Sequence, residues 1–386
     1  MPKIIRITTS PMALRYLLQD QMRFMKINGF DVIMISSDGK EVKSVIKNEG
    51  CEHIIVPMTR RITPLRDIIC LWQLIKIFKI EKPDIVHTHT PKAGLLGMMA
   101  AYFCSVKIRI HTVAGLPLMA EKGFKLVLLK VVEKITYSCA MYVWPNSFSL
   151  QKFIKENNFV KCEKMEVIGK GSSNGINLQK FNRKIISNDL ISLIKNQIAF
   201  SPENIYLLFV GRMVADKGIA ELVRSFRKLS ENNSALRLVL VGPFEDHLDP
   251  LPGDILKEII ENKAIHHIEW SENIAAFMAT CNYFIFPSHR EGFPNVLLQA
   301  GAIEIPIVCS DIPGNIDIVE DGVSGFIFKM GDQNALENAI ERAMGNKELS
   351  ERMTTNLFKR INENFDRQVI WNEILKKYRK LLGINN

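Results

Sequence analysis

Short apolar runs alternate with longer amphipathic stretches through both halves of this 386-residue chain. In the first half, strands are expected at Ile4–Ile7, Val32–Ser36, His53–Val56, Asp84–Thr88, Ile108–Thr112 and Tyr142–Trp144, and helices between and after them at 12–27, 41–49, 64–80, 93–104, 121–139 and 147–156. Strands that alternate with helices favour parallel pairing, because a parallel connection needs a long crossover. The pattern therefore predicts an α/β fold built on a doubly wound parallel sheet.

The second half repeats this alternation. Its expected strands are Tyr206–Val210, Leu236–Val241, Tyr283–Pro287, Ile307–Ser310 and Gly325–Phe328, and from about residue 334 onward the pattern is almost wholly helical. A link near 170–202 is rich in Gly, Ser and Asn around 169–175, so we expect one domain at 1–175, a second at 176–365 and a final helix at 366–386. With 47% hydrophobic residues, the chain has apolar material for two cores of ordinary size.

Composition favours a globular protein of the cytoplasm. The apolar run at 93–106 is too short to span a bilayer, and a strand pattern that begins at Lys3 leaves no room for a signal peptide. The seven cysteines form no C-x-x-C pair, and most lie in apolar surroundings, as buried reduced thiols do. A reducing compartment is therefore expected.

Charge is distributed unevenly along the chain. Of the net +9, residues 1–190 contribute +14 and residues 191–386 contribute −5. A basic half favours an anionic partner, which is either nucleic acid or an anionic membrane surface. The basic residues are not interleaved with stacking aromatics, and no helix-turn-helix, zinc-finger or RNA-binding signature is present, which disfavours nucleic acid.

The stretch 283–299, YFIFPSHREGFPNVLLQ, places polar groups where a ligand is expected. An apolar strand ends at a charged turn containing Glu291, and a helix-like run follows, which is the arrangement that binds ligands in open α/β sheets. Backbone amides at such a helix start attract anions, and here they belong to Gly292, Phe293, Asn295 and Val296. An acidic group beside this start suits a nucleotide sugar, although a Pro-capped turn with an incidental Glu has the same pattern.

This element resembles the E-x7-E motif of the retaining glycosyltransferases of family 4. In that family the first Glu contacts the donor sugar and the second holds the ribose hydroxyls, so the resemblance implies a sugar contact for Glu291 and a ribose contact for Gln299. Gln299 departs from the family pattern, because an amide lacks the charge that strengthens such a hydrogen bond. The resemblance covers essentially the whole chain. It implies the GT-B fold, in which two Rossmann-like doubly wound domains face each other across a cleft and the C-terminal helix returns to the first domain.

A basic motif follows the first strand of the second half. Gly211, Arg212 and Lys217 lie on a loop that leads into a helix beginning near Gly218, and two cations beside a helix start suit a diphosphate. A solvated basic turn is the alternative. In the family the matching Arg and Lys grip the donor diphosphate and stabilise the negative charge that develops on it, so the resemblance implies a catalytic role for both.

Two strand ends in the first half carry histidines, in IVHTHTPK at 85–92 and IRIHTVAG at 108–115. Both resemble family segments that face the cleft, and in the second of these a His followed by Thr often lies near the transferred sugar. His111 would bond a sugar hydroxyl or accept the proton of the incoming hydroxyl, and His89 and Lys92 would lie on the acceptor side. Histidines at strand ends are also frequent structural hydrogen-bonders. Some family members carry a second polar or histidine residue where Ala114 stands, so a base at that place is absent here. The loop 8–12 lacks the Gly-rich turn that is common in the family.

Several other chemistries are disfavoured. The chain has no D-x-D, no H-E-x-x-H and no Cys/His cluster with ligand spacing, so we expect metal-independent chemistry without a cofactor. His266 and His267 are adjacent and would point to opposite faces of a strand. The stretch 174–177, with Phe181, resembles the family's interdomain hinge. The overlapping G-x-S-x-G match at 171–175 is not followed by the helical face that the nucleophile elbow of a serine hydrolase needs.

The helix expected at 121–138 mixes lysines with bulky apolar residues. Four lysines share it with Phe124, Leu128, Val131 and Ile135. Such a helix suits a membrane interface, and a packed helix with solvated lysines is the alternative. The excess charge of the first half favours the membrane.

Together these features predict a cytoplasmic retaining glycosyltransferase, peripheral at the inner face of the membrane. It would move a hexose or an N-acetylhexosamine from a nucleotide-sugar donor, UDP-linked, to a lipid-linked saccharide acceptor in surface-polysaccharide biosynthesis. The domain 1–175 would bind the acceptor and 176–365 the donor. Two alternatives stay open: a catalytically weak sugar-binding or partner subunit, suggested by Gln299 and the first loop, and a GT-B epimerase or phosphorylase, because fold does not fix chemistry.

Overall fold

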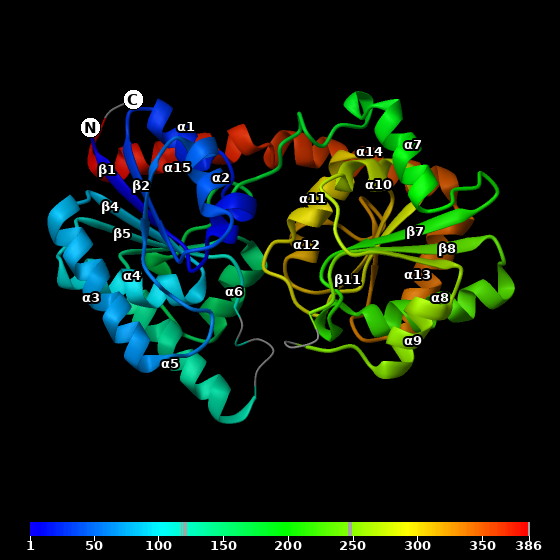
Figure 1. Ribbon diagram of the computed structural model, residues 1–386, viewed down its shortest axis with the longest axis horizontal. Coiled ribbons are helices and arrows are strands. Elements are labelled where there is room, and N and C mark those ends of the chain that lie inside the picture. The colour runs from blue at the N-terminus through cyan, green and yellow to red at the C-terminus, as the bar shows by residue number, and fades with distance from the viewer. Residues whose placement is uncertain (117, 119–121, 246–248, 385–386) are drawn as a thin grey trace. The chain divides into compact units, whose positions relative to one another are not determined.

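The computed structural model describes residues 1–116, 118, 122–245 and 249–384 (Figure 1). The chain forms two compact units, one made of Met1–Gly175 with Arg367–Asn386 and the other of Ile176–Asp366. Each unit contains one six-stranded parallel sheet with helices on both faces, so the predicted α/β architecture of two doubly wound sheets is confirmed.

The first sheet has the strand order β3-β2-β1-β4-β5-β6. Its strands are β1 (Lys3–Ile7), β2 (Asp31–Ser36), β3 (Glu52–Ile55), β4 (Ile85–His89), β5 (Ile108–Val113) and β6 (Tyr142–Pro145). Its helices are α1 (Gln21–Ile27), α2 (Val42–Glu49), α3 (Pro64–Glu81), α4 (Pro91–Phe103), α5 (Gly123–Cys139), α6 (Phe148–Glu156) and α15 (Arg367–Leu382). Glu121, the first residue of the helix predicted at 121–139, lies outside the described residues.

Alternate residues of each strand supply a core on each face of this sheet. In β1, Ile5 and Ile7 pack into the cluster that α3, α4, α5 and α6 cover. Ile4 packs into the cluster on the other face, which contains residues of α1, α2 and α15. Figure 1 shows the same two layers of helices. Because both faces are buried, the strands are nearly continuous apolar runs, which is typical of parallel sheets.

The single helix predicted at 12–27 is wrong. The segment forms a π-helical turn, η1 (Ala13–Leu17), and then α1, with Asp20 between them in a left-handed conformation at φ 64°. The buried carboxylate of Glu49 accepts hydrogen bonds from the amides of Asp20 at 2.6 Å and Arg23 at 2.9 Å. This side chain therefore satisfies amides at a break in the helix that the apolar period does not reveal.

The second sheet has the order β12-β11-β10-β7-β8-β9, which is the same winding as the first. Its strands are β7 (Ile205–Val210), β8 (Leu236–Val241), β9 (Ile265–Ile268), β10 (Tyr283–Phe286), β11 (Ile307–Ser310) and β12 (Phe326–Phe328). Its helices are α7 (Asn188–Gln197), α8 (Ile219–Asn232), α9 (Gly253–Glu261), α10 (Ile274–Thr280), α11 (Asn295–Ala302), α12 (Asn315–Ile318), α13 (Gln333–Gly345) and α14 (Lys347–Asn364), together with short 3₁₀ turns. The sequence pattern missed β9, a four-residue edge strand with two histidines, and α7, which lies inside the predicted link.

The last helix, α15, packs on the first unit, as the predicted return of the C-terminal helix requires. It buries Ile370, Ile374 and Tyr378, which recur at intervals of four residues. The Tyr378 hydroxyl accepts a hydrogen bond from Arg6 Nη1 at 2.7 Å and lies 2.5 Å from Nδ1 of His87. These polar contacts of Tyr378 therefore help to fix the orientation of α15 against the sheet, in addition to its apolar packing. Across the described residues, no helix is both long and apolar enough to cross a membrane.

Candidate active site

The carboxyl ends of β7 and β10 meet at the point where the strand order of the second sheet reverses. These two strands pair in parallel, with Tyr283 opposite Leu207 and Phe284 opposite Leu208. The connection after β7 leads to β8, and the connection after β10 leads to β11, toward the opposite edge of the sheet. The loops after the two strands therefore leave a crevice between them, which is where open α/β sheets bind ligands. The loop after β7 carries Arg212 and Lys217, and the loop after β10 carries Glu291.

Lys217 and Glu291 form an ion pair at this crevice. Nζ of Lys217 lies 2.5 Å from Oε1 of Glu291, and the two side chains are only 12% and 16% exposed. Ser288, also on the β10 loop, donates from Oγ to the same carboxylate oxygen at 2.9 Å. A lysine ammonium carries three protons, so Lys217 can hold Glu291 and still donate to a second anion. The structure thus joins two residues that lie 74 positions apart in the sequence.

Close backbone approach brings the two loops together. Gly218 has φ 69°, and a Cβ at this position would lie 2.2 Å from the carbonyl oxygen of Pro287, the residue that follows β10. Gly314, with φ 89°, approaches the carbonyl of Gly292 nearly as closely, and a Cβ there would lie 2.4 Å from the carbonyl oxygen. Only glycine fits either position without displacing the loops, because any side chain would clash with backbone.

Further ion pairs hold the loops that carry these residues. Nη1 of Arg212 donates to Oε2 of Glu245 on the loop after β8 at 2.7 Å, and Arg212 remains 42% exposed. Nη2 of Arg290 lies 2.9 Å from Oδ2 of Asp216. Sequence reasoning missed Glu245 and Ser288. Ser288 is detectable only as a neighbour of the motif, and Glu245 has no sequence signal because its loop comes from another strand.

Two helices begin at this crevice with their first amides uncapped by side chains. These are α8, which follows the left-handed Gly218, and α11, which follows Pro294. Uncapped amides and the positive end of the helix dipole favour an anion. The predicted amide donors Gly292, Asn295 and Val296 lie on the loop or first turn of α11, while the ring of Phe293 is buried against Phe365, with ring centroids 5.4 Å apart. Gln299 is half-buried on α11, within the same motif.

His289, two residues before Glu291 in the motif, makes a separate contact with a carboxylate. Its Nε2 lies 2.9 Å from Oε1 of Glu221 in the first turn of α8. Contact with the Glu221 carboxylate raises the pKa of His289 above its ordinary value, against an opposing effect of burial. This contact ties the β10 loop to the helix that begins beside Lys217.

In the first unit, the predicted site histidines are buried. His111 is 2% exposed, its Nδ1 lies 2.8 Å from the Thr88 hydroxyl, and its ring packs against Gly94, where a Cβ would come within 2.4 Å of it. Burial lowers the pKa of His111 to about 4, so the imidazole is neutral near pH 7. His89 is 1% exposed and stacks on His87, with ring centroids 4.3 Å apart.

Both ring nitrogens of His89 are buried without a hydrogen-bond partner among the described residues. A small, partly open cavity of about 10 Å³ lies beside them, and it is lined by His87, His89, Thr112, Trp144, Pro145, Asn146, Ile168, Ser172, Ser173 and Ile374. A cavity of this size holds about one water. Lys92 is only 11% exposed, and its Nζ lies 2.7 Å from Oδ1 of Asp67, so much of its charge is already neutralised within the unit.

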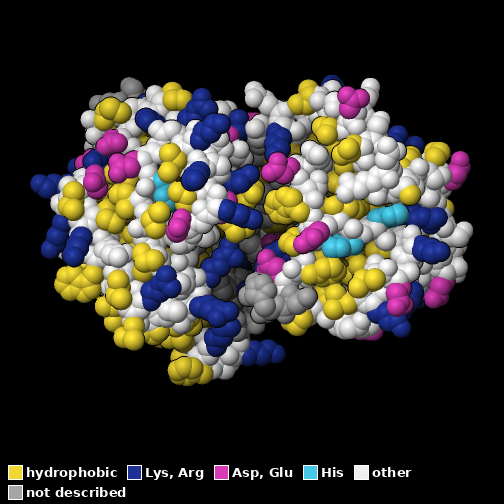
Figure 2. Space-filling view, in the orientation of Figure 1, with side chains coloured by type: hydrophobic (Ala, Val, Ile, Leu, Met, Phe, Trp, Pro, Cys, Tyr) yellow, Lys and Arg dark blue, Asp and Glu magenta, His cyan; other side chains and the backbone are white. Residues whose placement is uncertain are grey.

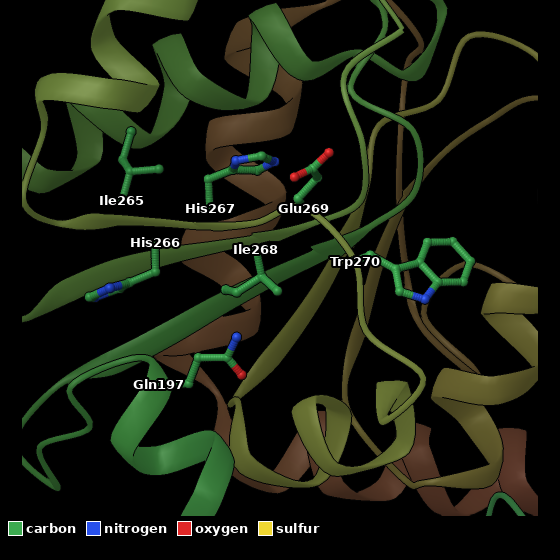
Figure 3. Close-up of a pocket in the computed structure, with 7 residues that line it drawn as sticks. All are labelled: Gln197, Ile265, His266, His267, Ile268, Glu269 and Trp270. Atoms are coloured by element: carbon green, nitrogen blue, oxygen red, sulfur yellow. The ribbon is translucent and has the colours of Figure 1, made fainter.

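A separate shallow pocket of about 610 Å³ follows the edge strand β9 (Figure 3). Figure 3 shows His266 and His267 on opposite sides of the strand, with Gln197 beneath His266. Nε2 of His267 lies 2.9 Å from the carbonyl oxygen of Gly242, and its ring centroid is 4.5 Å from that of Phe244. The two histidines therefore cannot act on one ligand, as their spacing predicts. In the part of the chain that the structure covers, no three His, Cys, Asp or Glu side chains gather as a metal site would require.

Comparison with known proteins identifies both halves of the chain. Residues 191–360 match the model of "Glycosyl transferases group 1", and residues 6–147 match "Glycosyl transferase 4-like". The capsular polysaccharide biosynthesis glycosyltransferase CapM of Staphylococcus aureus is 37% identical over 95% of this chain and 94% of its own length. An Escherichia coli UDP-Gal:alpha-D-GlcNAc-diphosphoundecaprenol alpha-1,3-galactosyltransferase is 28% identical over 83% of this chain and 82% of its own.

The fold also matches solved structures. Anabaena HepE in complex with UDP and glucose superposes with a TM-score of 0.80 at 18% identity, over 98% of this chain and 100% of that one. This likeness extends through both units.

Proposed function

Since the chain belongs to the group 1 glycosyl transferases, we propose that it moves a hexose or an N-acetylhexosamine from a UDP-linked donor to a lipid-linked saccharide acceptor, with retention of the anomeric configuration. The product would serve surface-polysaccharide biosynthesis. The 37% identity with a capsule glycosyltransferase supports a role in surface-polysaccharide biosynthesis. The relative from Escherichia coli, whose name gives a UDP-sugar and a diphosphoundecaprenol-linked acceptor, supports the substrate classes.

The contact between Lys217 and Glu291 carries this proposal. In a nucleotide sugar the anomeric carbon is bonded directly to the β-phosphate, so groups that bind the sugar and the diphosphate must lie side by side. Lys217 satisfies this requirement, because its ammonium touches the Glu291 carboxylate at 2.5 Å and has protons left for a phosphate oxygen. In the described contacts both donors to Glu291 reach Oε1, which leaves Oε2 for a sugar hydroxyl.

Arg212 and Lys217 would supply the main electrostatic stabilisation. As the bond from the sugar to the diphosphate breaks, negative charge grows on the leaving UDP. Preorganised cations at that place stabilise the transition state more than the ground state. Arg212 is held by Glu245 at 2.7 Å yet stays 42% exposed, so its guanidinium can exchange this partner for a phosphate. The uncapped amides at the starts of α8 and α11 would help to stabilise the same negative charge on the leaving UDP.

Gln299 would hold the ribose hydroxyls from α11. Such a contact is equally strong in the ground and transition states, so it contributes to donor binding rather than to turnover. Gly211 would approach the diphosphate through its backbone.

The acceptor side remains with the first unit, at the carboxyl ends of β4 and β5. His89 supports this placement best, since its two buried, unpartnered nitrogens adjoin a cavity lined by polar groups of three strand ends. His111, bonded to Thr88 and packed on Gly94, would orient this region as a neutral imidazole. Lys92 would act through its ion pair with Asp67, by fixing the start of α4.

A lipid-linked acceptor requires the enzyme to work at the membrane surface, and we place the anionic contact on α5. Lys122, immediately before α5, and Lys125 and Lys134 on it are exposed, and Lys130 is half-buried. The same helix carries Phe124, which is 83% exposed, and Val131, which is 48% exposed. Leu128, predicted on the same face, is half-buried instead. Basic residues near an anionic lipid surface each contribute about 1 kcal/mol.

The test is a donor screen with the purified protein. UDP- and GDP-linked sugars are supplied with and without a polyprenyl-diphosphate saccharide, nucleotide release is followed, and the product anomer is determined by NMR. One UDP-sugar should be consumed faster with the acceptor present, and the α-linked donor should give an α-linked product. Inversion at the anomeric carbon would refute the mechanism. A new sugar nucleotide without UDP release would reveal an epimerase, and binding without turnover a sugar-binding subunit.

A further inference from the structure

Helix α3 exposes an apolar stripe that packing of its own unit does not use. Leu65, Ile68, Ile69 and Trp72 are 82%, 54%, 55% and 61% exposed, and they recur at intervals of three and four residues on one side of the helix. The opposite side buries Cys70, Leu74 and Phe78 in the core of the first unit. A helix that is apolar on both sides is expected to be covered on both sides.

The charges of α3 point to what covers it. Its two acidic residues are neutralised within the unit, Asp67 by Lys92 and Glu81 by Lys3, each with an N–O distance of 2.7 Å. Its basic residues, Arg66, Lys76 and Lys79, are all exposed. The exposed charged residues of α3 are therefore all cationic, which complements an anionic surface.

Helix α5 presents a second stripe of the same kind. Phe124, Val127, Val131 and Ile135 are 83%, 58%, 48% and 39% exposed and recur at three- and four-residue intervals. Its one acidic residue, Glu133, is buried. Helix α4 packs against both α3 and α5, so the two stripes belong to one layer of helices. In Figure 2, hydrophobic and basic side chains gather over the part of the first unit where Figure 1 places α3 and α5.

We propose that the α3 stripe inserts into the acyl region of a lipid bilayer and that α3 and α5 together seat the first unit on the membrane. This inference rests on the proposed function, because a lipid-linked acceptor supplies the reason to bind a bilayer. It adds an apolar anchor on α3 to the electrostatic contact on α5. Single exposed apolar side chains are ordinary, whereas two stripes on helices whose exposed charges are cationic mark an interaction surface.

The two contributions differ in their response to salt. Charge attraction is screened over roughly 3 Å at about 1 M salt, whereas burial of apolar area persists. Full burial of each large side chain changes a partition coefficient by about tenfold or more. The electrostatic part should therefore disappear at high salt, while the part due to α3 should remain.

The test measures sedimentation of the full-length protein with phosphatidylcholine vesicles that contain phosphatidylglycerol, at low and high salt. The variant is Leu65→Ser with Trp72→Gln. Its matched control is Leu193→Ser with Ile260→Ser, which removes two side chains of 54% and 78% exposure from the second unit. All four positions are exposed, so folding should be unaffected, and circular dichroism and hydrolysis of the soluble donor verify this.

At high salt, wild type and control should keep part of their vesicle binding. The α3 variant should bind vesicles at least about tenfold less than wild type under the same conditions. In a Trp270→Phe background, Trp72 is the one tryptophan with high exposure, because Trp144 and Trp371 are each 3% exposed. Its emission should shift to shorter wavelength on vesicles.

Unchanged emission, or unchanged high-salt binding of the α3 variant, would overturn the proposal while leaving the donor screen untouched. A solution dimer that only this variant loses would reassign the surface to self-association. Conversely, salt-resistant insertion without glycosyl transfer would refute the proposed function and leave the membrane anchor standing.

Discussion

Removal of the Lys217 ammonium should reduce turnover far more than it reduces stability. The ammonium lies 2.5 Å from Glu291 and is 12% exposed, so it acts where solvent screens little. Loss of one preorganised donor from a developing oxyanion costs roughly 3–4 kcal/mol in the activation free energy, which is about two to three decades in kcat. Glu291 keeps its hydrogen bond from Ser288 at 2.9 Å, so Lys217→Ala should destabilise the fold only by about 1–2 kcal/mol.

The assay measures kcat for transfer at saturating donor, with guanidinium denaturation of each variant alongside. Lys228→Ala is the matched control, because Lys228 also forms a lysine–glutamate pair in the second unit, with Nζ 2.5 Å from Oε2 of Glu337, but lies on α8 away from the crevice. The control should retain native kcat. Arg212→Ala should resemble Lys217→Ala. The reasoning is refuted if the Lys217 and Arg212 variants are folded and keep kcat within about threefold of wild type.

The other predictions concern the donor contacts, the membrane and pH. Glu291→Gln should nearly abolish transfer, whereas Gln299→Ala should raise the KM for the donor with little change in kcat; the reverse order in steady-state kinetics would exchange the two roles. Changing the four α5 lysines to Glu should remove the salt-sensitive part of vesicle binding and lower transfer to lipid-linked acceptor, with donor hydrolysis intact; equal binding of wild type to neutral and anionic vesicles would contradict this. The four lysines changed to Glu in this charge-reversal variant are Lys122, Lys125, Lys130 and Lys134. Burial raises the pKa of Glu133 to about 7, so the folded state binds a proton that the unfolded state releases above about 4.5, and stability falls as pH rises from 4.5 to 7. Glu133→Gln should therefore stabilise the protein by up to about 3 kcal/mol at pH 8 and by little at pH 4, and equal effects in urea unfolding at both pH values would disprove the assignment.

Local features of the sequence were sufficient to predict the α/β architecture with its two parallel sheets. Period-two and period-3.6 patterns depend only on neighbouring residues, so they predicted most strands and helices, the parallel sheets and the helical C-terminus. The Glu291 motif and the basic loop at Arg212 identified the family for the same reason, because each lies within one strand-loop-helix segment. The pattern failed where distant groups decide the local conformation. The carboxylate of Glu49, for example, bonds amides at the break between η1 and α1, within the helix predicted at 12–27.

Only the tertiary structure decided which of these residues meet and which are exposed. Lys217 reaches Glu291 because β7 and β10 are neighbours in the sheet although 74 positions separate the two side chains. His111 has the sequence setting of a reactive histidine, yet the space left by Gly94 buries it and holds its pKa at about 4. The sequence predicts a helix at 64–80, but only the fold shows that the apolar residues around Trp72 on α3 are exposed. Periodicity fixes which side chains share a face of an element, but the order of strands and the packing of helices determine what that face contacts.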